Sequence, residues 1–224
     1  MTGVTAMVAA GIVNRFPSGE LQYDFVDTGI AVSNLTTYTF NNISLGAEHP
    51  TRRIYLVTIG INASGSRTIN SVTFNGASPT LLSSAGSTAQ PFHHSVISAP
   101  TGSTADISIT FSDSTTAGAV ALYRVINQQT ALGSVFIQNT TNAAIGTTGA
   151  SRTMNTEAGG FALVSLTTNA DISPFLATTG WKVDDGYTQV FFGSSNTLTP
   201  AGTTTFAYTQ PFAASRFSVT TLRA

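Results

Sequence analysis

The side chains of this 224-residue chain that could do chemistry are few, and the first group is a pair of histidines. His93 and His94 are adjacent, and His49 is the one other imidazole in the sequence. Neighbouring residues of a strand point to opposite faces, so both rings cannot bind one metal ion without a bulge. We therefore expect one ring to pack inward and the other to meet solvent, and we predict no metal site.

A second group combines carboxylates with aromatic rings. Asp184 and Asp185 lie between Trp181 and Tyr187. Such residues can bind a glycan, because carboxylates accept hydrogen bonds from sugar hydroxyls and rings stack on apolar sugar faces. A Ca²⁺ ion would need about six to eight oxygen ligands, and the spaced acidic residues of a dedicated calcium loop are absent. Asp-Asp-Gly is also an ordinary turn sequence, so a turn beside a core tryptophan is the simpler interpretation.

The sequence contains no pattern of a known catalytic site. It has no cysteine and no Gly-x-Ser-x-Gly elbow to supply a nucleophile, and it has no Walker loop or dinucleotide fingerprint. Glycoside hydrolysis needs two placed carboxyl groups, whereas the acidic residues here are scattered over turn-like positions. We predict that the protein is not an enzyme and that it has no catalytic residues and no cofactor.

Charge is scarce throughout the chain. Charged residues make up 8% of the sequence, the net charge is −1, and Lys182 is the single lysine. A typical soluble domain has about 25% charged residues. Nucleic-acid binding needs clustered Lys and Arg, and the nearest approach is Arg52 and Arg53 with Arg67, so we expect no nucleic-acid partner. A surface of Ser, Thr, Asn and Gln suits a protein that packs against copies of itself or against a partner.

Residues 1–13 are apolar, and the first basic residue is Arg15. A secretory signal places its positive charge first, and a membrane span needs about 20 apolar residues, so we predict neither and expect no membrane partner. We interpret the segment as an N-terminal strand or arm, and an arm that docks on a neighbouring subunit is the alternative. The predicted domains are 1–46, an arm with the first strands, and 47–224, a β-sandwich.

The elements that must position these residues are β-strands. Apolar and polar residues alternate at 37–40 and 107–111, as in half-buried strands, while the denser run 54–61 suits a strand buried on both faces. Asn75-Gly76 favours positive φ and predicts a type I′ hairpin after 69–74. Further strands are predicted at 92–97, 119–126, 161–166, 187–192, 203–209 and 217–222. Short strands separated by turns predict an all-β fold, an antiparallel β-sandwich of jelly-roll or Ig-like type.

Two halves of the chain match in outline. A strand, a turn of small residues and a second strand occur at 105–125 and again at 203–222. We therefore predict pseudo-repeats at 52–127 and 159–224, joined by a connection at 128–158. They could form the two sheets of one sandwich or two small sandwiches.

Three segments together resemble the β-sandwich structural proteins of tailed bacteriophages, which are found on heads or tails. The segments are 37–40 with 44–46, then 53–57, then 71–80, and the likeness spans about 37–125. In that family the last segment reads as a Ser-Val-Thr strand, a turn with glycine and then Ala-x-x-Thr. This chain has Asn-Gly where many of those proteins have Gly-Gly, which leaves the turn type open.

The resemblance implies a non-enzymatic virion structural protein, a capsid- or tail-associated decoration or accessory subunit assembled in the host cytoplasm. Its implied partners are copies of itself, in a homo-oligomer, and other virion proteins. The alternative is a glycan- or receptor-binding, lectin-like module of a phage tail or fibre, which would use the four residues Trp181, Asp184, Asp185 and Tyr187.

Overall fold

The structure is a computed structural model that describes residues 20–61, 65–85, 90–143, 148–168, 177–187, 189–209 and 214–224. These residues form sixteen strands in four antiparallel sheets, together with one short 3₁₀ helix, η1 (Leu132–Ser134). This arrangement confirms the predicted all-β sandwich fold. Within the part of the chain that is described, no helix is long and apolar enough to cross a membrane.

The first half of the chain packs a five-stranded sheet on a three-stranded sheet. The five-stranded sheet has the order β1 (Gln22–Ala31), β8 (Ala117–Ile126), β3 (Arg53–Ile61), β6 (Phe92–Ser98) and β5 (Thr80–Ser84). The three-stranded sheet has the order β2 (Leu35–Ser44), β7 (Thr104–Thr115) and β4 (Ile69–Phe74).

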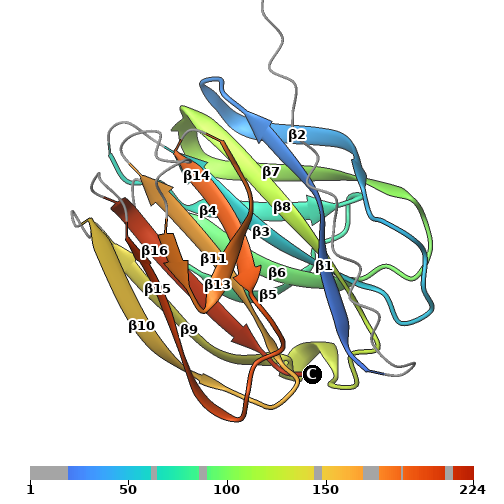
Figure 1. The fold of residues 1–224 in the computed structure, drawn as a ribbon. Coiled ribbons are helices and arrows are strands. Elements are labelled where there is room, and N and C mark those ends of the chain that lie inside the picture. Colours follow the sequence, from blue (N-terminus) through green and yellow to red (C-terminus); the bar gives the residue numbers. More distant parts are fainter. Residues whose placement is uncertain are drawn as a thin grey trace, which may run out of the picture.

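The second half repeats this topology. Its five-stranded sheet has the order β13 (Trp181–Tyr187), β14 (Val190–Ser195), β11 (Phe161–Thr168), β16 (Ala214–Leu222) and β9 (Phe136–Ala143). Its three-stranded sheet has the order β10 (Gly149–Thr156), β15 (Gly202–Thr209) and β12 (Ala177–Thr179). Strands β1 to β8 therefore correspond in order to β9 to β16. Figure 1 shows the two halves in separate regions, blue to green and yellow to red.

The central strands of both five-stranded sheets are buried on their two faces. In β3, Leu56 packs toward the three-stranded sheet of the first half, while Val57 packs toward the second half. In β11, Val164 packs toward the three-stranded sheet of the second half, while Leu163 packs toward the first half. Three apolar layers thus lie between four sheets, and the prediction that 54–61 is buried on both faces is confirmed.

The strands that fall within the predicted domain ranges are distributed over the sheets of both halves. Strands β1 and β2, assigned from the sequence to 1–46, belong to the two sheets of the first half. The predicted connection 128–158 contains η1, β9 and β10, of which the last two are strands of the second half. The segments that echo one another, 105–125 and 203–222, fall on β7–β8 and β15–β16, which are equivalent strands. Residues 1–19 of the predicted arm lie outside the described residues.

The Asn75-Gly76 turn forms, but the hairpin does not continue beyond it. Asn75 and Gly76 have φ angles of 48° and 79°, as a type I′ turn requires, and the amides of Phe74 and Ala77 each donate to the other's carbonyl, at 2.8 and 3.0 Å. However, β4 lies in the three-stranded sheet and β5 in the five-stranded sheet. The chain crosses between sheets next to Pro79, which has no amide hydrogen to donate to a ladder.

Glycine lets the two sheets of the first half come close together. Gly60 of β3 and Gly118 of β8 lie opposite each other. A methyl group on Gly60 would lie 2.4 Å from the ring of Phe111, and one on Gly118 would lie 2.7 Å from the ring of Tyr38. These two rings meet edge to face with centroids 5.8 Å apart, so an aromatic pair presses directly on glycine backbone.

Candidate interaction surfaces

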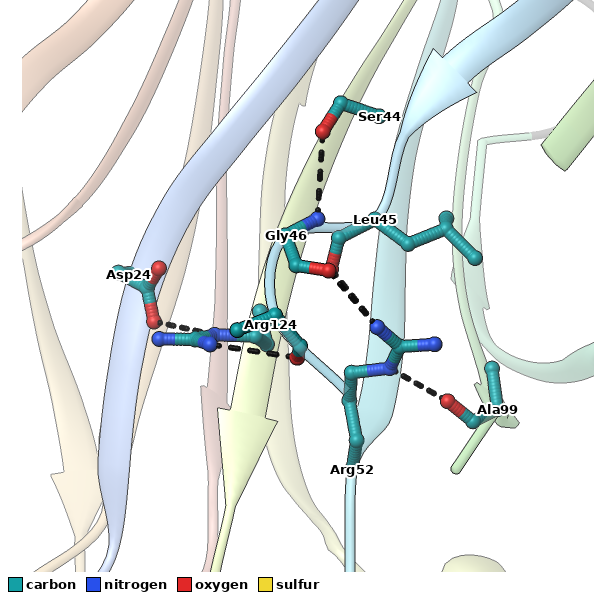
Figure 2. A network of polar contacts seen from close by, with 8 residues as sticks. Asp24, Ser44, Leu45, Gly46, Arg52, Ala99 and Arg124 are labelled. Carbon is teal, nitrogen blue, oxygen red and sulfur yellow. Dashed lines mark hydrogen bonds and ion pairs between the residues drawn. The ribbon is translucent and has the colours of Figure 1, made fainter. Parts of the chain in front are cut away.

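The most buried cation among the described residues holds two loops together. Arg52 is fully buried, and its guanidinium donates to carbonyl oxygens at both loops, part of which Figure 2 shows. The acceptors are Leu45 (3.4 Å), Gly46 (3.0 Å), Ala99 (2.5 Å), Thr101 (2.8 Å) and Gly102 (2.6 Å). Burial lowers the pKa of Arg52. Arg52 belongs to the group of arginines that comes nearest to a basic cluster in the sequence. Its guanidinium is buried and holds the two loops in place.

Other charged side chains also pair with groups of the same chain, several of them at the surface. Arg124 pairs with Asp24 at 3.0 Å and donates to the carbonyl oxygen of Ala47 at 3.3 Å (Figure 2). Asp27 accepts the amide of Ser44 at 2.7 Å and so ties β1 to β2. Further internal pairs join Arg53 to Gln128 and Thr130, Arg67 to Asp113, and Arg223 to Glu157. The charges thus fix loops and strand contacts rather than forming one exposed patch.

The predicted glycan residues share strand β13 but do not converge on an open face. Trp181 is fully buried, its indole N–H donates to the carbonyl oxygen of Ala207 at 2.8 Å, and its ring covers Gly193. The ring therefore packs in the core, as in the simpler interpretation of Trp181, and it has no free face of the kind that the lectin-like alternative would use to stack a sugar. The side chain of Tyr187 lies outside the described residues.

The two aspartates of this group have separate surroundings. The Asp184 side chain is 1% exposed and pairs with Lys182, and its Oδ2 atom has no hydrogen-bond partner. Burial, followed by the negative charge of Asp184, raises the pKa of Tyr123 in β8, so Asp184 belongs to the boundary between the two halves. Asp185 accepts the amide of Gly186 at 2.8 Å, and partial burial raises the pKa of its carboxyl group.

His94 also lies at the boundary between the halves. Its Nδ1 atom is 2.7 Å from the hydroxyl of Thr220, which in turn is 2.9 Å from the hydroxyl of Ser83. Burial, helped by the neighbouring His93, lowers the pKa of His94 to about 3. His93 is partly exposed, and its own burial lowers its pKa to about 4. No group of three or more His, Asp or Glu side chains among the described residues could hold a metal ion.

The outer faces of the three-stranded sheets are lined with hydroxyl groups. In the first half, two rungs cross β2, β7 and β4, each with three hydroxyl side chains in register. The rungs are Thr37–Thr110–Ser71 and Thr39–Ser108–Thr73. Adjacent hydroxyls bond to each other in both rungs, at 3.2 Å between β2 and β7. In the second half, Thr153 and Thr205 form the same 3.2 Å contact across β10 and β15. Hydroxyl and apolar residues alternate along these strands, and this alternation could have predicted the hydroxyl-lined outer face of each three-stranded sheet.

Two clefts lie at opposite ends of β1, among the residues described. The first has a volume of about 380 Å³ and is lined by the apolar residues Ile30, Val32, Ile61, Ala117, Ala119 and Val190 together with Thr116, Gly118 and Gln189. The second has a volume of about 330 Å³ and lies where the described chain starts, beside Glu20, Leu21 and Ala224. Val190 and Ala224 belong to the second half, so each cleft is shared by the two halves.

Comparison with known proteins gives no family assignment. No protein-family model and no curated protein sequence matches the chain. The chain is similar to a chain in the atomic structure of Sulfolobus turreted icosahedral virus, with a TM-score of 0.23 and 13% identity, over 96% of this chain and 99% of that one. It is also similar to a turret protein in Sulfolobus turreted icosahedral virus, with a TM-score of 0.21 and 13% identity, over 89% of this chain and 98% of that one. Scores at this level do not establish a shared fold.

Proposed function

We propose that this protein is a non-enzymatic structural subunit of a virion, which acts by packing against copies of itself and against other virion proteins. The observation that carries the proposal is the distribution of polar groups. Buried and paired charges serve the fold, while the outer sheet faces present neutral hydroxyls that already bond to one another in register.

Such faces lose little when a partner covers them. Removing an ionised group from water costs several kcal/mol unless it is well paired, as a rough guide, whereas a hydroxyl that keeps a hydrogen bond is buried at small cost. The molecule itself contains an example of such burial. At the boundary between the halves, Thr220 and Ser83 are buried on facing sheets with their hydroxyls 2.9 Å apart. A hydroxyl-lined sheet face can therefore be covered by another sheet in this protein.

The edge strands support the same proposal. An exposed edge is usually protected by lysine, proline or a covering element, because its free N–H and C=O groups pair with other chains. Leu81 on edge strand β5 is 53% exposed, and Val183 on edge strand β13 is 41% exposed beside Lys182, the one lysine of the chain. Apolar side chains at sheet edges favour cover by another protein. The finer assignment to a decoration or accessory subunit of a capsid or tail, assembled in the host cytoplasm, rests on the resemblance of 37–125 to tailed-phage proteins.

The proposal is tested on particles and in solution. Mass spectrometry of purified virus particles from the source of the gene is expected to find the protein in a fixed copy number, and sedimentation velocity is expected to show self-association that grows with concentration. The double substitution Thr39→Lys and Thr73→Lys should weaken incorporation by adding charge to the outer face, while Thr39→Ser with Thr73→Ser should not. A protein that stays monomeric at high concentration and is absent from particles would refute the proposal, and glycan-array binding by that monomer would favour the receptor-binding alternative.

A further inference from the structure

We propose that Asn75 is a site of spontaneous covalent modification, at which the amide nitrogen of Gly76 attacks the side-chain carboxamide and ammonia is released. The proposal goes beyond the proposed function and does not depend on it, because the reaction needs only this chain and water. Asn75-Gly76 is the one Asn-Gly pair in the sequence, and both residues are exposed. The hold of Asp106 on the Asn75 side chain and the freedom of Gly76 carry the inference.

The reaction balances within the chain. A bond forms between the Gly76 nitrogen and Cγ of Asn75, and the side-chain nitrogen leaves as ammonia with the proton that the Gly76 nitrogen loses. Glycine permits this attack because it has no Cβ to obstruct it. The product is a five-membered imide ring in the main chain. Water then opens the ring at either carbonyl, which leaves aspartate or isoaspartate at position 75 and adds about 1 Da to the chain.

Asp106, in the neighbouring strand β7, holds the carboxamide that is attacked. Its amide donates to Asn75 Oδ1 at 2.8 Å, and its carbonyl oxygen accepts the amide of Asn75 at 2.8 Å. The first bond polarises Cγ and is aimed at the oxygen that becomes negative during the attack. Neither bond involves atoms beyond the Cα–C bond of Asn75. Rotation about that bond can therefore bring the Gly76 nitrogen toward Cγ while Asp106 keeps the side chain in place.

Gly76 can make this movement because the hairpin ends at the turn. Among the described residues its amide donates no hydrogen bond, and no atom lies within 4 Å of the place where a methyl group would be. The turn is closed by the two bonds between Phe74 and Ala77, and β5 continues in the other sheet. Rotation therefore breaks two hydrogen bonds and leaves the ladder between β4 and β7 intact, which is a small local opening.

The Asp185-Gly186 pair in β13 shows the opposite situation. Gly186 lies opposite Phe191 in the ladder between β13 and β14, and its amide donates to Asp185 Oδ1 at 2.8 Å. A methyl group on Gly186 would lie 2.6 Å from the Phe191 ring. Attack by this nitrogen requires a length of strand to detach, so the same chemistry should be slow there.

The modification changes the outer face of the first half. Asn75 and Asp106 lie two residues beyond Thr73 and Ser108, which belong to one of the hydroxyl rungs. A carboxylate at position 75 takes the net charge of the chain from −1 to −2, and it lies beside Asp106, which is itself acidic. The free protein should therefore lose the neutrality of this face as it ages.

Peptide mapping by mass spectrometry tests the proposal on the Asp185→Asn variant, in which one chain carries two identical dipeptides. During incubation at pH 8.0 and 37 °C, we expect the gain in mass to be at least about tenfold faster at position 75 than at position 185, because the strand holds the second glycine. In guanidinium chloride that unfolds the protein, the two rates should become equal. Asn75→Gly, which suits the same type I′ turn, should show no gain at position 75.

Two results would overturn the proposal. Equal rates at the two positions of the folded variant would show that the dipeptide alone sets the rate and that the turn contributes nothing. A folded wild-type protein that gains no mass at position 75, while the unfolded chain does, would show that the turn protects Asn75. Neither result bears on the proposed function, which fails if the chain is monomeric and absent from particles.

Discussion

Acid is expected to destabilise the folded protein because two histidines, the fully buried His94 and the partly exposed His93, stay neutral in it. The ordinary pKa of histidine is about 6.5, and in the folded protein it falls to about 3 for His94 and about 4 for His93. Below pH 6.5 the unfolded chain binds protons that the folded chain refuses. The free energy of unfolding therefore falls as pH drops from 6.5 toward these lower values. Above pH 6.5 the histidines are neutral in both states and cause no loss of stability.

The size of the effect follows from the shifts. Each histidine lowers the free energy of unfolding by about 1.4 kcal/mol for each pH unit below 6.5. At pH 5.0, His94 alone should therefore lower it by roughly 2 kcal/mol and the two histidines together by roughly 4 kcal/mol. A domain has a total stability of only about 5–15 kcal/mol. The surroundings of His94 reinforce its neutrality, because Thr220 and Ser83 carry no charge and the buried cation Arg216 lies over the Phe92 ring that contacts it.

Urea unfolding at pH 7.5 and pH 5.0 measures the effect, with His94→Phe as the test variant. The loss of stability between the two pH values should be about 2 kcal/mol smaller in His94→Phe than in the wild type. Comparing variants removes the contributions of Asp24 and Asp185, whose raised pKa values act with the opposite sign. Val96→Ala is the matched control: it faces the same boundary, so it should cost stability equally at both pH values. An unchanged pH dependence in His94→Phe would refute the reasoning.

Three further substitutions test the packing, each by urea unfolding at pH 7.5. Gly60→Ala should lower the free energy of unfolding by about 1–3 kcal/mol, because the new methyl group would overlap the Phe111 ring, while Gly133→Ala, with no atom within 4 Å, should change it by less than about 0.5 kcal/mol. Arg52→Met should cost at least about 3 kcal/mol, because it leaves buried carbonyl oxygens without donors. Trp181→Ala should cost about 3–5 kcal/mol by opening a core cavity, so lost glycan binding in that variant would not identify a sugar site.

The sequence predicted several strands of the first half because strand periodicity is local, whereas the strand predicted at 187–192 spans the break between β13 and β14. Alternation at 37–40 and 107–111 identified β2 and β7, and the unbroken apolar run at 54–61 identified a strand buried on both faces. The positive φ angles of Asn75-Gly76 were also predictable from those two residues. The sequence did not predict which sheet β5, the strand after this turn, would join, because that depends on packing against strands far away in the sequence.

The candidate glycan residues show the limit of sequence proximity. A loop would have brought Trp181 and Asp184 together, but the two residues lie in a strand, where a separation of three places them on opposite faces. Trp181 accordingly enters the core of the second half, while Asp184 turns toward Tyr123 of the first half. A register shift between Val183 and Asp185 adds a further break in the alternation, and no feature of the sequence marks such a bulge.

The low charge of the chain has two causes, and only one of them bears on function. Two five-stranded sheets lie inside a stack of four, so their central strands have almost no side that faces water, and any protein of this architecture would have fewer charges. The outer faces of the three-stranded sheets are different, because they do meet solvent. Lysine and glutamate would be tolerated at positions such as Thr39 and Thr153, yet hydroxyls occupy them and bond across the strands. The proposal that a partner covers this surface in the assembled state therefore rests on the outer faces of the three-stranded sheets and not on the composition of the whole chain.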